Sequence, residues 1–268
     1  MKLLPIFVAA AIVMVNGDAR ADQPEKPADQ PLKAFAQLPL MQDAQLSPNG
    51  KYIAYFYPIN GRNHIVMQPL GDADNRQVVP PAGDLDFDWL HWANNDRLIF
   101  VASFFGKRFN TETKETRLAS IKRDGTDLQW IVKSAESDSL TGSRLSTTPD
   151  IPPQIQDDVI SWLPDESDYI LVALDENFDG KDEVRRININ TGDYTNVRGG
   201  LRGVQNWMVD ANNEVRLGYG YHKSEFMLKF LNAEQQWVSG TKTDWWERGW
   251  HPVVFTEDPM VAYAIGPN

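Results

Sequence analysis

A short phrase recurs along the chain: an apolar or aromatic residue, a polar turn, and then a short run rich in β-branched and aromatic residues. Its five copies begin at Leu46, Trp92, Trp162, Trp207 and Phe255, so successive copies lie 46, 70, 45 and 48 residues apart. A period of roughly 40 to 45 residues is typical of β-propellers, in which each repeat forms one blade. The repeat therefore predicts an all-β propeller of four-stranded antiparallel blades.

The fifth copy begins close to the last residue, Asn268. A blade needs about four strands, and the residues that follow Phe255 have room for about one. We therefore expect about four and a half blades and an incomplete propeller, cut short in its last blade.

Tight turns separate the apolar runs at close intervals. Glycine and asparagine tolerate positive φ and favour such turns in antiparallel hairpins. No window shows the long 3.6-residue apolar stripe of an amphipathic helix. The predicted hairpin turns are Asn60-Gly61, Asp124-Gly125, Asp179-Gly180 and Thr191-Gly192-Asp193.

The longest interval between copies contains a polar stretch from Lys133 to Asp158, rich in Ser, Thr, Asp and Pro. Such a composition predicts a surface insertion on the second blade. Two interpretations are open, a functional flap and an ordinary solvated loop, and the frequency of disordered long loops favours the second.

The first residues have the pattern of a secretory signal peptide, assigned to 1–21. Lys2 supplies the positive start, an apolar run of about 13 residues follows, and Ala19-Arg20-Ala21 forms a small-x-small cleavage site. Such a run is shorter than the roughly 20 residues that span a bilayer. Residues 22–33 are then a proline-rich linker, and 34–268 the propeller domain. We expect export to the periplasm or the medium, with no stable membrane anchor.

Composition excludes several classes of protein. With 26 basic and 37 acidic residues the formal net charge is −11, which argues against binding to nucleic-acid phosphates. The absence of cysteine excludes disulfides, thiolate metal sites and a cysteine nucleophile.

Several phrases, taken in order, resemble the propeller of secreted bacterial prolyl oligopeptidase-family serine peptidases. The resemblance covers about residues 35–266, although SPNGK also occurs in TolB-type propellers. The phrases are 35–40 (FAQLPL), 46–55 (LSPNGKYIAY), 92–100 (WANNDRLIF), 159–172 (VISWLPDESDYILV), 184–192 (VRRININTG) and 207–216 (WMVDANNEVR).

This resemblance implies a peptidase in two parts, a propeller that restricts access to peptide-sized substrates and an α/β-hydrolase domain that carries Ser, Asp and His. A hydrolase nucleophile sits in a Gly-x-Ser-x-Gly elbow, and the chain contains none. It also lacks the βαβ alternation of a hydrolase sheet. No catalytic residue can be assigned, and we expect this chain alone to be inactive.

The sequence therefore predicts the non-catalytic propeller part of an exported serine peptidase. Its expected partners are a peptide substrate and a C-terminal or separate hydrolase domain. The main alternative is a stand-alone periplasmic, TolB-like propeller that binds proteins or peptides as a scaffold. A less favoured alternative is a five-bladed glycan-acting propeller, which would need paired carboxylates.

One acidic loop has oxygen ligands at alternate positions and a glycine at its turn, as calcium loops do. Its candidate ligands are Asp175, Asn177, Asp179 and Glu183. Arg186 occupies the position where an EF-hand needs a bidentate glutamate, so an acidic hairpin turn is the favoured interpretation. No other cofactor is expected.

The histidines and tryptophans are weaker indications of a metal or ligand site. The four histidines are scattered, without the spacing of a zinc site, and are expected to be ordinary residues at blade edges. A tryptophan cluster can line a ligand site, but packing between blades is the favoured use. These residues are His64, His91, His222 and His251, and Trp245, Trp246 and Trp250.

Overall fold

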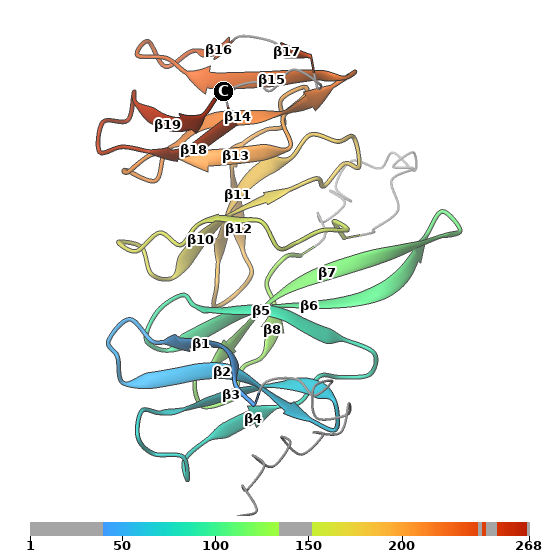
Figure 1. Ribbon diagram of the computed structural model, residues 1–268, viewed down its shortest axis with the longest axis vertical. Helices are drawn as coiled ribbons and strands as arrows, with labels where there is room; N and C mark the ends of the chain where they lie inside the picture. The colour runs from blue at the N-terminus through green and yellow to red at the C-terminus, as the bar shows by residue number, and fades with distance from the viewer. Residues whose placement is uncertain (1–39, 134–151, 241–242, 245–250, 267–268) are drawn as a thin grey trace, which may run out of the picture. The chain divides into compact units, whose positions relative to one another are not determined.

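The computed structural model describes residues 40–133, 152–240, 243–244 and 251–266. The chain divides into two units between Leu38 and Pro39, and all described residues belong to the second. Every regular element in these ranges is a β-strand (Figure 1). None of the described residues forms a helix that could cross a bilayer.

Two antiparallel four-stranded sheets account for the first half of the described chain, and in each the strands pair in sequence order. The first contains β1 (Gln42–Leu46), β2 (Tyr52–Ile59), β3 (Arg62–Pro69) and β4 (Gln77–Val79). The second contains β5 (Asp86–Trp92), β6 (Arg97–Arg108), β7 (Thr111–Lys122) and β8 (Gln129–Trp130).

The second half repeats this arrangement twice and adds a two-stranded sheet. The third sheet contains β9 (Val159–Ser161), β10 (Tyr169–Leu174), β11 (Glu183–Asn188) and β12 (Tyr194–Arg198). The fourth contains β13 (Asn206–Val209), β14 (Val215–His222), β15 (Glu225–Leu231) and β16 (Trp237–Ser239), with β17 (Thr243–Asp244) paired to β15. The fifth contains β18 (His251–Phe255) and β19 (Ala262–Ile265).

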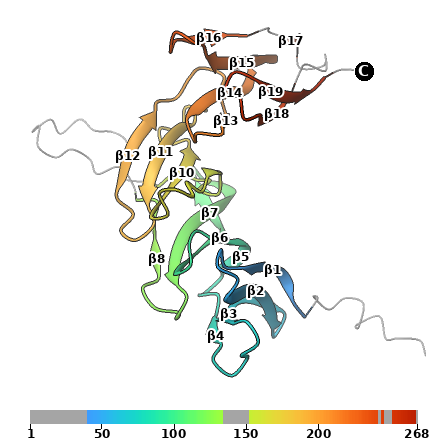
Figure 2. The ribbon, with the colours of Figure 1, turned by 90° about the vertical axis from the view of Figure 1, so that its left-hand side faces the viewer.

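Consecutive four-stranded antiparallel meanders are the blades of a β-propeller. The all-β propeller prediction is therefore confirmed, and four sheets followed by a two-stranded one agree with the expected four and a half blades. Each sheet can be followed in Figure 2 by its colour, from blue β1 to red β19.

Each copy of the repeated phrase marks the first strand of a sheet. Leu46, Trp92 and Phe255 end β1, β5 and β18, Trp207 lies in β13, and Trp162 follows β9 directly. Because Phe255 ends the first strand of its hairpin, the fifth sheet has two strands instead of the one expected.

Hydrophobic clusters join successive sheets through both faces of their strands. In β6, Leu98 and Phe100 pack in a cluster with the first sheet, whereas Ile99 and Val101 pack in a cluster with the third. In β10, Leu171 and its alternate neighbours likewise pack with the fourth sheet. Side chains alternate between the faces of a strand, so a strand buried on both faces has a continuous apolar run.

The predicted hairpin turns are confirmed. Asn60 and Gly61 join β2 to β3 with φ angles of 52° and 78°, as a type I′ turn requires. Gly125, Gly180 and Gly192 also have positive φ, in the turns after β7, β10 and β11.

Some predicted features lie outside the described residues, namely segments 1–21 and 22–33, residues 134–151 of the predicted insertion, and Trp245, Trp246 and Trp250. The end of that insertion, residues 152–158, is described and differs from a solvated loop. Gln156 is fully buried, and the backbone oxygen of Gln154 accepts a hydrogen bond from the nitrogen of Thr116 in β7 at 2.9 Å. This end of the stretch is therefore part of the packed fold.

Candidate functional site

The first strands of neighbouring sheets lie side by side. β1 contacts β5, and β9 contacts β13. Gln45 in β1 donates from Nε2 to the backbone oxygen of Leu90 in β5 at 2.8 Å. Besides the packing of their faces, these pairs of sheets therefore also approach each other at their first strands. Side chains from the first three sheets converge at this edge.

A shallow hollow of about 340 Å³, largely open to solvent, lies at this edge, between β1, β5 and the chain around β9. We call it the inner cavity. Its walls carry three carboxylates, two indoles and one imidazole, from Asp43, Asp157, Asp158, Trp89, Trp162 and His91. Its volume is at the lower end of the range of about 300 to 1,000 Å³ that is typical of ligand sites.

Asp43 enters the cavity from an irregular stretch of β1. The pairing of β1 with β2 shifts between Gln42 and Gln45, and Asp43 has a φ of 51°. Such bulges turn a side chain away from the regular alternation of a strand. The Asp43 carboxylate accepts a hydrogen bond from the backbone nitrogen of Leu90 at 3.4 Å.

Three rings form the aromatic wall. Trp89 and Trp162 meet edge to face, with centroids 6.2 Å apart and planes at 87°. His91 stacks on Trp162 at 3.9 Å, with planes at 26°. Burial lowers the pKa of His91, against a smaller opposite effect of Asp43, and thus favours the neutral imidazole.

Residues 152–158 carry the remaining two carboxylates and are attached to β7. The backbone nitrogen of Gln156 donates to Thr116 Oγ1 at 2.7 Å, and its side-chain Oε1 accepts from the nitrogen of Leu118 at 3.4 Å. The amide of Gln156 also donates to the oxygen of Pro153 at 3.0 Å. These bonds hold the segment in one position beside the cavity.

A buried ion pair secures the start of the same segment. Arg108 donates from Nε and Nη2 to the two carboxylate oxygens of Glu115, each at 2.5 Å, and from Nη2 to the oxygen of Pro152 at 2.8 Å. Arg117 adds a contact to Glu115 at 3.2 Å. The hydrogen bond from Arg108 lowers the pKa of Glu115 to about 2, against the opposing effect of burial.

The two carboxylates at the end of the segment have raised pKa values. Burial raises the pKa of Asp157, and burial together with the charge of Asp157 raises that of Asp158 to about 6. Among the described residues, no donor or cation bonds to the Asp158 carboxylate. Burial and the charges of Asp175 and Asp158 raise the pKa of the nearby Asp182 to about 7.

The predicted calcium ligands lie in the β10–β11 turn and bond to one another and to the turn. Asp175 accepts from the backbone nitrogens of Asp179 at 3.0 Å and Gly180 at 3.1 Å. Asn177 donates to Glu183 at 2.9 Å, and Lys181 pairs with Asp179. Within the described ranges no group of three or more histidines and carboxylates is arranged to hold a metal. The calcium loop stays a prediction.

Serine hydroxyls in the sheets are used for structural bonds. Ser103 Oγ donates to Asp88 at 2.7 Å, and Ser161 Oγ lies 2.6 Å from Asn213 Oδ1, which accepts its hydrogen bond. Of the histidines, His64 contacts the oxygen of Arg62 at 3.0 Å, and His251 lies 5.0 Å from the ring of Phe226. His91 lines the inner cavity.

Comparisons with known proteins assign no family. No family model matches the chain, and no curated protein matches its sequence. Among solved structures, TolB from Acinetobacter baumannii is 10% identical, with a TM-score of 0.39 and coverage of 76% of this chain and 44% of TolB. Dipeptidyl peptidase 4 from Porphyromonas gingivalis is 11% identical, with a TM-score of 0.46 and coverage of 81% and 34%.

An oligogalacturonate lyase in complex with manganese is 12% identical, with a TM-score of 0.43 and coverage of 84% of this chain and 58% of the lyase. The chain thus spans less than two thirds of each of these three proteins. Likeness at this level assigns no activity.

The inner cavity cannot be predicted from the sequence. The pattern of the chain places His91 at a blade edge and Trp162 in the repeated phrase, but it assigns no role to Asp43, Asp157 or Trp89. One local feature could have indicated the site: the adjacent Asp157 and Asp158 directly precede a strand and Trp162 of the repeated phrase. Their convergence with β1 and β5 depends on the packing of three sheets.

Proposed function

We propose that this chain is a non-catalytic propeller scaffold that binds a peptide segment at the inner cavity. The observation that carries the proposal is the convergence of the first strands of neighbouring sheets around one cavity with aromatic and acidic walls. Ligand sites are typically concave, with aromatic walls and a few placed polar groups. The hydrogen bonds of Gln156 and Arg108 hold one wall in place before any ligand arrives.

More specifically, we propose that the chain is the propeller part of an exported serine peptidase. In such a peptidase the propeller would restrict which peptides reach the hydrolase domain. The ordered phrases between residues 35 and 266 and the signal-like segment 1–21 support this form. The missing Gly-x-Ser-x-Gly elbow supports a non-catalytic role for this part.

A stand-alone periplasmic scaffold is the second candidate. It is favoured by the fact that the cavity walls come entirely from residues between Asp43 and Trp162, so the cavity needs no other domain. Reading the gene beyond the codon for Asn268 separates the two forms. An in-frame hydrolase supports the peptidase part, and a stop codon with no hydrolase downstream or in a neighbouring gene overturns it.

The scaffold itself is tested with the purified chain and a library of fluorescent decapeptides. We expect a subset to bind with micromolar affinity by fluorescence anisotropy and to remain intact by mass spectrometry after prolonged incubation. If the chain still cleaves peptides after contaminating serine proteases have been removed during purification, the non-catalytic role is contradicted. Failure of every peptide to bind would overturn the scaffold.

A further inference from the structure

We infer that the peptide site extends along the hairpin of β6 and β7, where an extended peptide adds to a free edge of β6 as a further strand. We call the outer part of this hairpin, residues 104–115, the arm. The inference rests on the proposed function, because it names how a bound peptide continues beyond the inner cavity. It follows from an unpaired strand edge, exposed aromatic side chains, a strained turn and the place of the arm beside that cavity.

The arm has two strands where the rest of its sheet has four. β6 pairs with β7 along the whole length of both strands, up to Arg108 opposite Thr111. Its pairing with β5 ends earlier, where Ser103 lies opposite Asp86. Beyond Ser103, none of the described strands pairs with β6 on the side of β5. Figure 1 shows the hairpin extending past the end of β5.

Hydrogen bonds on the other side of the arm show which backbone groups of β6 are free. The nitrogen of Thr116 donates to the oxygen of Gln154 at 2.9 Å, and the oxygen of Lys114 accepts from the Gln154 amide at 3.0 Å. Two residues directly opposite in an antiparallel pair either bond to each other or both point away. Phe105, opposite Lys114, therefore directs its N–H and C=O to the free edge, as does Lys107 two residues on. An extended peptide matches such an edge.

One face of the arm is closed by its own side chains. Arg108 pairs with Glu115 on this face, and the guanidinium of Arg117 lies over the ring of Phe104, 5.2 Å from its centroid. A Cβ at Gly106 would lie 3.1 Å from Cγ of Glu115, so the glycine gives this carboxylate room. These contacts hold the arm in place before a peptide binds, which lowers the entropic cost of adding a strand.

The free edge carries exposed aromatic side chains. Phe105 is 75% exposed and Phe109, in the turn, is 83% exposed, the two highest values among the large apolar side chains of the described residues. Because side chains alternate along a strand, Phe105 lies on the face opposite Phe104. Exposed rings on a fixed strand give an added peptide apolar contacts for its alternate side chains.

The turn at the tip of the arm holds a bulky residue in an unfavourable backbone conformation. Phe109 and Asn110 have φ angles of 49° and 65°, as a type I′ turn requires. In the β2–β3 hairpin the same two positions are Asn60 and Gly61, which tolerate positive φ. A phenylalanine seldom adopts it, and backbone strain of this kind is concentrated at functional sites. The strain at Phe109 is therefore an independent indication that the tip has a role beyond the fold.

The base of the arm lies beside the inner cavity. Lys114, opposite Phe105, pairs with Asp88 of β5 at 2.9 Å. Burial raises the pKa of Asp157, a wall residue of the inner cavity, and the nearby charges of Asp88 and Lys114 act on the same carboxyl with opposite signs. A peptide that leaves the inner cavity on this side would therefore meet the free edge of β6.

The test uses a fluorescein-labelled decapeptide of alternating threonine and valine, which has no charged side chain and favours an extended backbone. Two analogues carry N-methyl groups on alternate residues, one on the threonines and the other on the valines. Alternate N–H groups of an added strand face its neighbour. One analogue should therefore bind at least about tenfold more weakly than the parent peptide, and the other within about twofold of it. Fluorescence anisotropy with the full chain measures the affinities.

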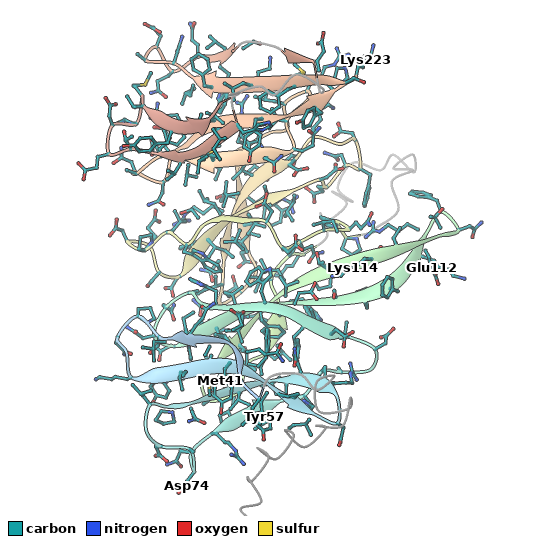
Figure 3. All side chains as sticks on the ribbon, viewed as in Figure 1. Met41, Tyr57, Asp74, Glu112, Lys114 and Lys223 are labelled. Carbon is teal, nitrogen blue, oxygen red and sulfur yellow. The ribbon has the colours of Figure 1, made fainter. Side chains whose placement is uncertain are left out.

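Two proline variants locate the added strand. Lys107→Pro removes the N–H that Lys107 directs to the free edge, and we expect it to weaken binding of the decapeptide at least about threefold. The matched control is Glu112→Pro, directly opposite in the hairpin, which removes an N–H on the other edge of the arm (Figure 3). It should leave the affinity unchanged. Thermal melts check that both variants fold, and if Lys107→Pro does not, the two N-methyl analogues decide the question.

A third variant tests the strained turn. Asparagine tolerates positive φ, so Phe109→Asn should raise the melting temperature. The same change removes an exposed ring and should weaken binding of the decapeptide at least about threefold. Leu70→Asn, which removes an exposed apolar side chain from the first sheet, is the control and should leave binding unchanged. Higher stability together with weaker binding is not expected of a residue that serves only the fold.

The outcomes separate this inference from the proposed function. If the threonine–valine decapeptide does not bind while other decapeptides do, or if both N-methyl analogues bind equally well, the inference is overturned and the scaffold stands. Equal affinity of the parent chain and a folded Lys107→Pro variant has the same meaning. If sedimentation shows a dimer that Lys107→Pro abolishes, a second copy occupies the edge and the inference is again wrong. If no decapeptide binds at all, the proposed function fails as well.

Discussion

The indole Nε1 of Trp92 donates a hydrogen bond to the backbone oxygen of Gln45, 47 residues earlier in the chain, at 3.2 Å. The same relationship recurs between the third and fourth sheets, where Trp207 Nε1 donates to the oxygen of Asp182 at 2.8 Å. A tryptophan of the repeated phrase thus joins its own sheet to the preceding one. The repeat encodes contacts between blades as well as strands within them.

Replacing Trp207 with phenylalanine should destabilise the fold by about 1 to 3 kcal/mol, because a buried indole contact is lost and the Asp182 oxygen loses its donor. Urea unfolding followed by circular dichroism measures this. The control is Trp130→Phe at an exposed tryptophan of β8, where we expect a change of less than about 0.5 kcal/mol. Equal effects of the two variants would contradict a linking role for Trp207.

Glu115→Gln should destabilise the protein by about 3 to 5 kcal/mol, because it leaves the buried Arg108 guanidinium without its counter-charge. The exposed Glu112 on the same hairpin provides the control Glu112→Gln, with little expected effect (Figure 3). Since the pKa of Glu115 is lowered to about 2, its contribution is present above about pH 4.5 and disappears as the pH falls toward 2. The free energies of unfolding of Glu115→Gln and Glu112→Gln should therefore approach each other as the pH falls toward 2.

Asp182 gives the opposite dependence on pH. Its pKa is raised to about 7, so the folded chain binds a proton more tightly than the unfolded chain. The stability that this group contributes is present below about pH 4 and is lost as the pH rises through 7. Asp182→Asn should match the parent chain in melting temperature near pH 4 and exceed it at pH 8. A constant difference across this range would show that Asp182 does not titrate in the fold.

Calcium titration tests the acidic loop of β10 and β11. If Asp175, Asp179 and Glu183 form a calcium site, calcium at about 1 mM should raise the melting temperature, as a ligand of the folded state does. Asp179→Asn should abolish that rise, and magnesium provides the ionic control. An unchanged melting temperature would leave the residues as an acidic hairpin turn, in which their oxygens serve the hydrogen bonds already described.

Much of the fold could be predicted from local patterns. The run from Leu98 to Ala102 is apolar throughout because β6 packs on both faces, and its composition indicated a strand without any knowledge of its neighbours. Asn60-Gly61 predicted the β2–β3 hairpin because the turn requires positive φ at both residues. Because these features depend on a few consecutive residues, they can be predicted from the sequence.

The sequence by itself thus determined the repeat, the strands and the hairpin turns, and its composition excluded thiol chemistry and argued against nucleic-acid binding. Only the tertiary structure brought Asp43, Trp89 and Asp158 to one cavity, since they come from different sheets and far apart in the chain. It also decided that residues 152–158 pack on β7 rather than lie in solvent, through the buried amide of Gln156. The local sequence pattern indicates which face of a strand is apolar, whereas a site made of several strands depends on how the sheets pack.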